Sequence, residues 1–125
     1  MRYAIMLTAV FMFSVSSVSA ESTAEMLSSC SVFAEAKVRN NEIIFLQNFD
    51  SGICWGAFSA IQSLIPRTYA NGQHMFYVCA PPTSRRHQLI AIFVEYAKRN
   101  PQRLHENFFD VAIDSLQAAF PCQQR

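Results

Sequence analysis

The residues best suited to chemistry in this sequence are four cysteines, Cys30, Cys54, Cys79 and Cys122. Thiolates bind zinc or act as nucleophiles, and both roles usually leave a signature such as C-x-x-C or an adjacent histidine. None of the four has that spacing or such a neighbour. The pattern therefore disfavours metal binding and cysteine catalysis, and the even count favours disulfide bonds in an oxidising compartment.

Three histidines and a few carboxylates are the remaining candidates for chemistry. No two of the histidines, His74, His87 and His105, are spaced i, i+4, so no helical metal pair is expected. Asp110 and Asp114 have that spacing, which is typical of a solvated helix edge rather than an acid–base pair. The sequence also lacks G-x-S-x-G, H-E-x-x-H and a glycine-rich phosphate loop. We therefore predict no catalytic residue, no metal and no cofactor, and thus no enzyme.

Composition limits the class of protein. The chain has 125 residues, enough for one domain, and with 51% hydrophobic and 15% charged residues it is not typical of a disordered chain. Ten basic and nine acidic residues give a net charge of +1, and the pair Arg85–Arg86 is too short to form a basic surface. Nucleic acid is therefore not an expected partner.

Residues 1–20 have the layout of a secretory signal peptide. Arg2 supplies a basic start, about ten largely apolar residues follow from Ala4, and Val18 and Ala20 occupy the −3 and −1 positions of a cleavage site. The apolar run is too short for a membrane anchor, and no later segment is long and apolar enough to span a bilayer. We predict a signal peptide over 1–20 and a mature domain over 21–125 that is not in the membrane after cleavage.

The elements expected to position these residues are helices. Apolar residues recur at about 3.6-residue spacing in four segments, over 23–39, from a cap at Asp50 or Ser51 to Pro66, from a cap at Thr83 or Ser84 to 99, and over 101–120. Gly56 is expected to allow close approach of a neighbouring backbone. The run 43–46 fits a strand or a buried helical turn, and 67–78 fits a short hairpin or a loop pinned at its base. The predicted fold class is all-α: a compact, disulfide-stapled bundle of about four helices after an N-terminal signal peptide.

Helix geometry ranks the three possible disulfide connectivities. The third and fourth predicted helices are joined by almost no loop, so they should be antiparallel neighbours. Cys79 lies just before the third helix and Cys122 just after the fourth, which places these two cysteines side by side. The favoured pairing is therefore Cys79 with Cys122, which leaves Cys30 with Cys54.

The loop before Cys79 is the best candidate for binding a partner. Arg67 and Tyr69, residue types common at interface anchors, lie beside the strong turn signal Asn71-Gly72. We predict partner contacts at Arg67, Tyr69, Asn71 and His74, with an ordinary connecting loop as an equal alternative and the segment 42–50 as the next candidate interface.

The second half of the chain carries a set of motifs in a fixed order, namely Cys54-Trp-Gly-Ala-Phe-Ser-Ala-Ile61, Cys79-Ala-Pro81, Asn100-Pro101 and Ala119-Phe-Pro-Cys122. Over about 52–122 this order and spacing resembles the Rap/Tai family of immunity proteins of type VI secretion systems. The resemblance implies a small all-helical periplasmic protein of Gram-negative bacteria that has no catalytic residues and is commonly dimeric. Such a protein binds a toxic effector, often a peptidoglycan amidase, and sterically blocks its active site. A periplasmic stress chaperone or housekeeping binding module of the same helical architecture is the alternative.

Overall fold

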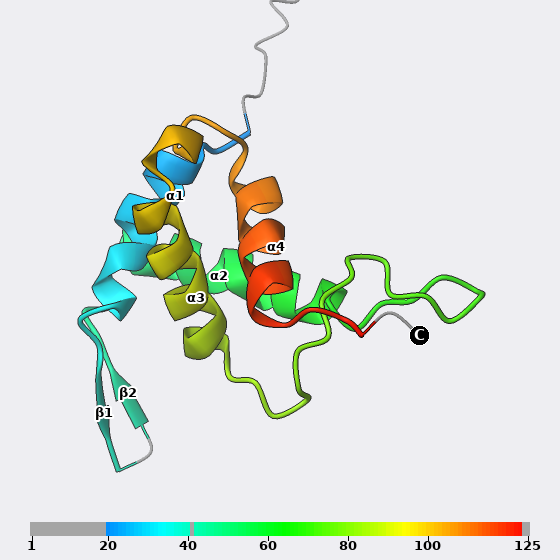
Figure 1. Ribbon diagram of the computed structural model, residues 1–125. Helices are drawn as coiled ribbons and strands as arrows, with labels where there is room; N and C mark the ends of the chain where they lie inside the picture. The colour runs from blue at the N-terminus through cyan, green and yellow to red at the C-terminus, as the bar shows by residue number, and fades with distance from the viewer. Residues whose placement is uncertain (1–19, 41, 124–125) are drawn as a thin grey trace, which may run out of the picture.

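The computed structural model describes residues 20–40 and 42–123. Figure 1 shows the elements, which run in the order α1 (Thr23–Cys30), η1 (Ser31–Phe33), β1 (Lys37–Arg39), β2 (Glu42–Ile44), α2 (Phe49–Leu64), α3 (Arg86–Arg99), η2 (Pro101–Arg103) and α4 (Phe108–Ala119). The predicted signal peptide falls almost entirely outside the described residues. No helix in the described part of the chain is long and apolar enough to cross a membrane.

The all-α prediction is wrong, because a two-stranded antiparallel sheet follows the first helix. The predicted helix over 23–39 ends at Cys30 and continues only as the 3-10 turn η1. Strand β1 then pairs with β2 in the register Lys37 with Ile44 and Arg39 with Glu42. Asn40 has φ 50° at the end of β1, a left-handed conformation that asparagine tolerates in tight turns. The backbone N–H and C=O groups of residues 37–39 therefore bond across the hairpin to β2 instead of along a longer helix.

Helix α2 begins earlier than expected. Its cap is Asn48 rather than Asp50 or Ser51: the Asn48 side chain accepts a hydrogen bond from Ser51 N at 2.9 Å, and the Ser51 hydroxyl accepts one from Asn48 N at 2.9 Å. This reciprocal arrangement satisfies two backbone donors at once. The expected role of Gly56 is wrong, since a Cβ built there would meet no atom within 4 Å.

The predicted helix over 101–120 is divided into η2 and α4. The intervening backbone bonds to the start of α1 instead of continuing a helix, with Thr23 N donating to Glu106 O and Ala24 N to Leu104 O, both at 2.9 Å. Asn107 then caps α4, and its Oδ1 accepts from Phe109 N at 2.8 Å. Helix α3 likewise starts at Arg86, two residues after the later of its expected caps.

Helix α3 lies at the centre of the core, as its wide apolar face predicts, and packs against α1, α2 and α4. Three buried phenylalanines, one from each of α2, α3 and α4, meet there. The ring centroids of Phe58 and Phe93 are 5.6 Å apart, those of Phe93 and Phe108 are 5.2 Å apart, and the pair Phe93–Phe108 is edge-to-face. Such geometry adds to the stabilisation from burial alone.

Two disulfides hold the elements together in the favoured pairing. Cys30, the last residue of α1, is bonded to Cys54 in the second turn of α2. Cys79, in the segment leading to α3, is bonded to Cys122 after α4. Backbone contacts reinforce the second bond, because Cys79 N donates to Phe120 O at 2.9 Å and Val78 forms a bridge with Pro121. The loop before Cys79 is thereby tied to the end of the helical bundle.

Candidate functional site

A narrow loop, residues 67–78, projects from the helical body between α2 and α3 (Figure 1), and we call it the projecting loop. Its two arms are held together by Tyr69 N, which donates to Gln73 O at 2.9 Å, and by Met75 N, which donates to Arg67 O at 3.0 Å. Gly72 closes the tip with φ 82°, a conformation that disfavours residues with a Cβ. One isolated bridge, Thr68 with His74, replaces a regular ladder. The segment thus combines the two forms left open by the sequence, with hairpin-like pairing between Thr68 and His74 and a base pinned by the Cys79–Cys122 disulfide.

The four predicted contact residues all lie on this projecting loop. Arg67, Tyr69 and Asn71 are exposed, and Tyr69 keeps 50% of its surface accessible. The Asn71 Oδ1 atom also accepts from Gln73 N at 3.0 Å and so rigidifies the turn. His74 differs from the others: it is half-buried, and its Nδ1 atom is buried without a hydrogen-bond partner.

Tyr77 adds a second exposed aromatic ring to the same loop. Its hydroxyl accepts a hydrogen bond from Gln73 Nε2 at 2.6 Å, and its backbone has a φ of 52°. Gln117 Nε2 of α4 donates to Phe76 O at 2.9 Å and anchors this side of the loop to the bundle. Sequence reasoning missed Tyr77 because it placed the residue inside a possible strand.

Four exposed apolar side chains lie on the hairpin and at the start of α2. We call them together the hairpin patch: Val38, Ile44, Leu46 and Phe49, the last with 82% of its surface accessible. Val38 and Ile44 lie on opposite faces of the two-stranded ribbon, because Val38 pairs with Ile43 and Ile44 pairs with Lys37. Sequence reasoning noted the apolar run within 42–50 but not its exposure. Figure 1 shows the hairpin and the projecting loop at separate ends of the molecule, so they form two distinct surfaces.

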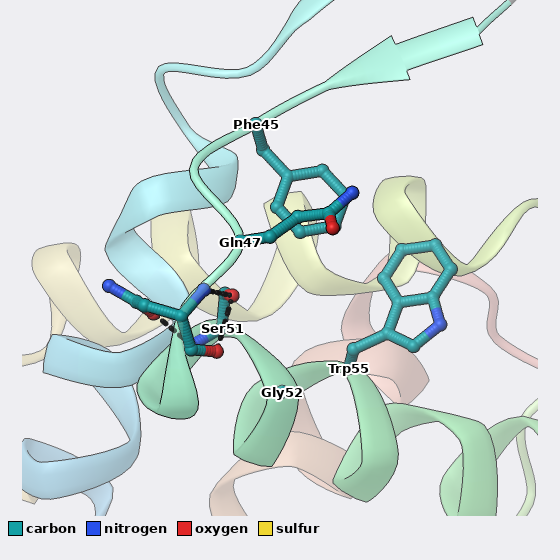
Figure 2. A pocket seen from close by; sticks show the side chains of 6 residues that line it. Phe45, Gln47, Ser51, Gly52 and Trp55 are labelled. Atoms are coloured by element: carbon teal, nitrogen blue, oxygen red, sulfur yellow. Dashed lines mark hydrogen bonds between the residues drawn. The ribbon is translucent and has the colours of Figure 1, made fainter.

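A shallow hollow of about 400 Å³ adjoins the hairpin patch. Figure 2 shows Phe45, which follows β2, and Trp55 of α2 on its walls, with Gln47, Ser51 and Gly52 nearby. The rings of Phe45 and Trp55 are stacked with centroids 5.9 Å apart, and Phe33 stacks against Trp55 at 5.7 Å. The Arg86 guanidinium lies 4.7 Å from the Trp55 ring centroid, a cation–π contact that fixes the indole. These contacts make the hollow part of the packing that holds the hairpin to α2.

A second groove of about 540 Å³ runs between α3 and α4. It is lined mainly by small and apolar side chains, with the charged residues Glu95 and Arg99 also in its lining: Ala91, Ile92, Glu95, Tyr96, Arg99, Ser115, Ala118 and Ala119. Glu95 and Arg99 form an exposed ion pair at 2.7 Å, the i, i+4 pair that the helix predicts.

The pKa shifts of two ionisable groups, Glu106 and His87, have causes in the local packing. Hydrogen bonds from Arg103 hold the pKa of Glu106 below its usual value, and Arg103 also pairs with Asp114 at 2.7 Å. The pKa of His87 is lowered by partial burial and by the nearby charge of Arg85. In residues 20–40 and 42–123, one set of potential metal-ligating atoms lies close together, a ring nitrogen of His74 with the sulfurs of Cys79 and Cys122, and both sulfurs are engaged in the disulfide.

The family model for Rap1a immunity proteins matches this chain over residues 22–122. The chain belongs to this family. The Rap1a match spans both disulfides, the projecting loop and the hairpin patch, and it confirms the resemblance to Rap/Tai immunity proteins. Rap1a proteins are immunity proteins, which act against secreted effectors by inhibition rather than by catalysis. No curated protein and no solved structure matches the chain significantly.

Proposed function

We propose that this Rap1a protein is a periplasmic immunity protein that binds a toxic type VI secretion effector, a peptidoglycan amidase, and sterically blocks its active site. The observation that carries the proposal is the family match over residues 22–122. Two disulfides support the location, because such bonds persist in oxidising compartments and are rare in the cytosol. The signal-peptide pattern of residues 1–20 supports export, with cleavage after Ala20.

The projecting loop is our proposed contact surface. The loop is narrow and carries Arg67, Tyr69 and Asn71 in exposed positions along its length, and hydrogen bonds within the loop hold their backbone in place. A rigid loop loses little conformational freedom on binding and can enter a concave surface such as a hydrolase cleft. His74 supports the base of the loop. The effector would be inhibited because the loop excludes its substrate.

Co-expression tests the proposed function directly. The product of the adjacent gene, as the candidate effector, is directed to the periplasm of a test strain, with and without the immunity protein. We expect protection from lysis and co-purification of the two proteins in a defined stoichiometry. Lysis that is the same with and without the immunity protein, together with no co-purification of the two proteins, would contradict the proposal. Purified effector assayed on isolated peptidoglycan then shows whether it is an amidase.

Alanine substitution maps the contact surface. We expect the fourfold variant Arg67→Ala, Tyr69→Ala, Asn71→Ala and His74→Ala to weaken effector binding by about 2 kcal/mol or more, close to thirtyfold in Kd. A triple variant that keeps His74 separates loss of contacts from loss of loop support. Leu46→Ser with Phe49→Ser is the matched control on the hairpin patch. Unchanged affinity in the loop variants and weakened binding in the control would move the interface to residues 42–50.

The exposed hairpin patch favours one other candidate function, a periplasmic chaperone that holds apolar segments of unfolded clients. Exposed apolar side chains such as Leu46 and Phe49 suit this role. An aggregation assay with an unrelated client at acid pH distinguishes the two functions. A chaperone suppresses aggregation, whereas an immunity protein leaves it unchanged and binds its effector alone.

We also propose that the protein forms a homodimer, as the resemblance to Rap/Tai proteins implies. The apolar lining of the groove between α3 and α4 makes it a candidate for the dimer interface. Light scattering should give the mass of two mature chains, and Ala118→Arg, which places a charge in the groove, should give the mass of one. A single-chain mass for the unmodified protein would contradict the dimer.

A further inference from the structure

The two disulfides differ sharply in their access to solvent. Cys30 and Cys54 are both 0% exposed, whereas Cys79 is exposed and Cys122 is half-buried. Thiol–disulfide exchange requires an attacking thiolate to reach a sulfur atom, so an added reductant should open Cys79–Cys122 first. The second bond is therefore the site in this protein where cysteine chemistry can occur without unfolding.

His74 lies beside the exposed disulfide. One of its ring nitrogens and the sulfurs of Cys79 and Cys122 are all within 4.8 Å of one another. Its Nδ1 atom is buried and has no hydrogen-bond partner, which costs about 1–3 kcal/mol for a typical polar group. Buried polar atoms are nearly always paired, so an unpaired nitrogen on a ring that lies next to an exposed disulfide favours an ion-binding explanation.

We propose that reduction of the Cys79–Cys122 bond converts this corner into a three-ligand zinc site, formed by the two thiolates and the imidazole of His74. A dithiol reductant supplies two electrons and two protons: the S–S bond breaks, two cysteine thiols form, and the reductant becomes a disulfide. Zinc then displaces the two thiol protons, and water takes the fourth position. The proposal does not rest on the proposed immunity function, although the site shares His74 with the projecting loop.

The distances between the donor atoms suit zinc after a small rearrangement. With Zn–S bonds of about 2.3 Å and Zn–N bonds of about 2.0–2.1 Å in a tetrahedron, neighbouring ligand atoms lie roughly 3.5–3.8 Å apart. Once the disulfide opens, rotation about the Cα–Cβ bonds lets the two sulfurs separate, with the Cα atoms 5.0 Å apart. The ring nitrogen of His74 lies within 4.8 Å of both sulfurs, so it must move closer by up to about 1 Å to reach the zinc geometry.

Other contacts hold the corner in place when the disulfide opens. Cys79 N donates to Phe120 O at 2.9 Å, and Gln117 Nε2 of α4 donates to Phe76 O at 2.9 Å. The bridge between Thr68 and His74 keeps the histidine at the base of its loop. The reduced chain therefore retains three ligands on a prepared backbone, an arrangement that lowers the cost of binding.

The test uses the mature chain and a graded series of dithiol concentrations. Alkylation and mass spectrometry should find Cys79 and Cys122 modified while Cys30–Cys54 stays bonded. After anaerobic removal of the reductant, Co²⁺ serves as the spectroscopic probe. We expect a thiolate-to-cobalt charge-transfer band at one ion per chain, release of two protons, and displacement of the band by Zn²⁺. The oxidised protein should give no band.

Substitutions separate the ligands from their surroundings. Cys79→Ser with Cys122→Ser should abolish the band, and Cys30→Ser with Cys54→Ser should retain it. Loss of a residue that only supports a metal ligand typically costs at least about tenfold in affinity, so loss of a ligand itself should cost no less. We therefore expect His74→Ala to weaken Co²⁺ binding by about tenfold or more, and His105→Ala, at an exposed position, to have no effect.

Three results would overturn the proposal. The first is a reduced protein with a native circular dichroism spectrum and no charge-transfer band. The second is His74→Ala binding Co²⁺ as tightly as the unmodified chain, which would reduce the site to two cysteines. The third is unfolding on selective reduction, since the ligands would then no longer be held together.

Discussion

Phe58 joins three helices through one side chain. It projects from α2, is fully buried, and has ring centroid distances of 5.6 Å to Phe93 of α3 and 5.8 Å to Phe108 of α4. Few side chains contact so many elements, and protein interiors relax only partly when a large group is removed. The stability of the bundle should therefore depend strongly on this residue.

We expect Phe58→Ala to lower the free energy of unfolding by about 3–5 kcal/mol, because it removes apolar contacts and leaves a cavity. Urea unfolding followed by circular dichroism measures the change. Phe49→Ala is the control, since Phe49 is 82% exposed and its loss should change stability by no more than about 0.5 kcal/mol. A similar fall in the free energy of unfolding for the two variants would contradict the placement of Phe58 at the contact between α2, α3 and α4.

Arg103 links the turn after α3 to α3 and α4 through polar contacts. Its guanidinium pairs with Glu106 at 2.6 Å and with Asp114 of α4 at 2.7 Å, and it donates to the Tyr96 hydroxyl of α3 at 3.0 Å. Bidentate contacts of this kind fix geometry as well as charge. Arg103 thus sets how the turn between α3 and α4 meets both helices.

The Arg103–Glu106 pair predicts a pH dependence of stability. Arg103 holds the pKa of Glu106 below its ordinary value of 4.5, so on acidification the unfolded chain takes up this proton before the folded chain does. The contribution is therefore complete above about pH 4.5 and is lost as the pH falls further. We expect Glu106→Gln to flatten the acid side of the stability–pH curve, measured by urea unfolding from pH 7 to pH 3. Glu95→Gln, in an exposed pair, is the control, and an equal flattening there would contradict the prediction.

At the scale of elements, the sequence predicts the long helices better than the connections between them. The apolar faces of α2, α3 and α4 are visible as 3.6-residue periodicity, because burial of one face dominates their energetics. The end of α1 and the break before α4 are not visible. Lys37–Arg39 pairs with Glu42–Ile44 in a short hairpin that competes with helix, and residues 104–106 bond to Thr23 and Ala24, about eighty positions away, so pairing outside the helical period decides both conformations.

The sequence predicts the candidate contact surfaces only in part, because some of their features are encoded locally and others depend on the packing of the whole chain. Asn71-Gly72 encodes its turn locally, and Gly72 indeed has the positive φ that such a turn requires. The exposure of Leu46 and Phe49 depends on how the hairpin leaves the bundle, and no local pattern carries that information. The position of His74 beside Cys122 depends likewise on a residue more than forty positions away in the sequence.

The hairpin patch leads to a prediction for this element. Leu46→Ser with Phe49→Ser should leave the free energy of unfolding within about 0.5 kcal/mol of the unmodified value for each substitution, since both side chains are mostly in solvent. Thermal unfolding measures this. Trp55→Ser is the contrasting variant, because it removes the stacking with Phe33 and Phe45 and should destabilise the protein markedly. A large loss in the double variant would mean that the patch is covered.

At the scale of the whole molecule, the two disulfides secure different parts of a small domain. In the chain-entropy model each stabilises by about 3–4 kcal/mol, a large share of the roughly 5–15 kcal/mol typical of a domain. We expect Cys30→Ser with Cys54→Ser to lower stability more than Cys79→Ser with Cys122→Ser, because only the first pair would leave hydroxyls in the apolar core. Urea unfolding of both variants measures the difference. The reverse order would contradict the burial argument.

The disulfide pairing also bears on how the chain matures. The bonds join the first cysteine to the second and the third to the fourth, so each bond closes within its own half of the cysteine sequence. In a chain that emerges N-terminus first, the next thiol to appear after Cys30 is its partner Cys54, and the next after Cys79 is its partner Cys122. If the thiols are oxidised in the order in which they emerge, the native pairing forms directly among the three possible connectivities. The slow reshuffling that would follow a non-native bond is then not needed. We therefore expect maturation of this protein to need an oxidant but no disulfide isomerase.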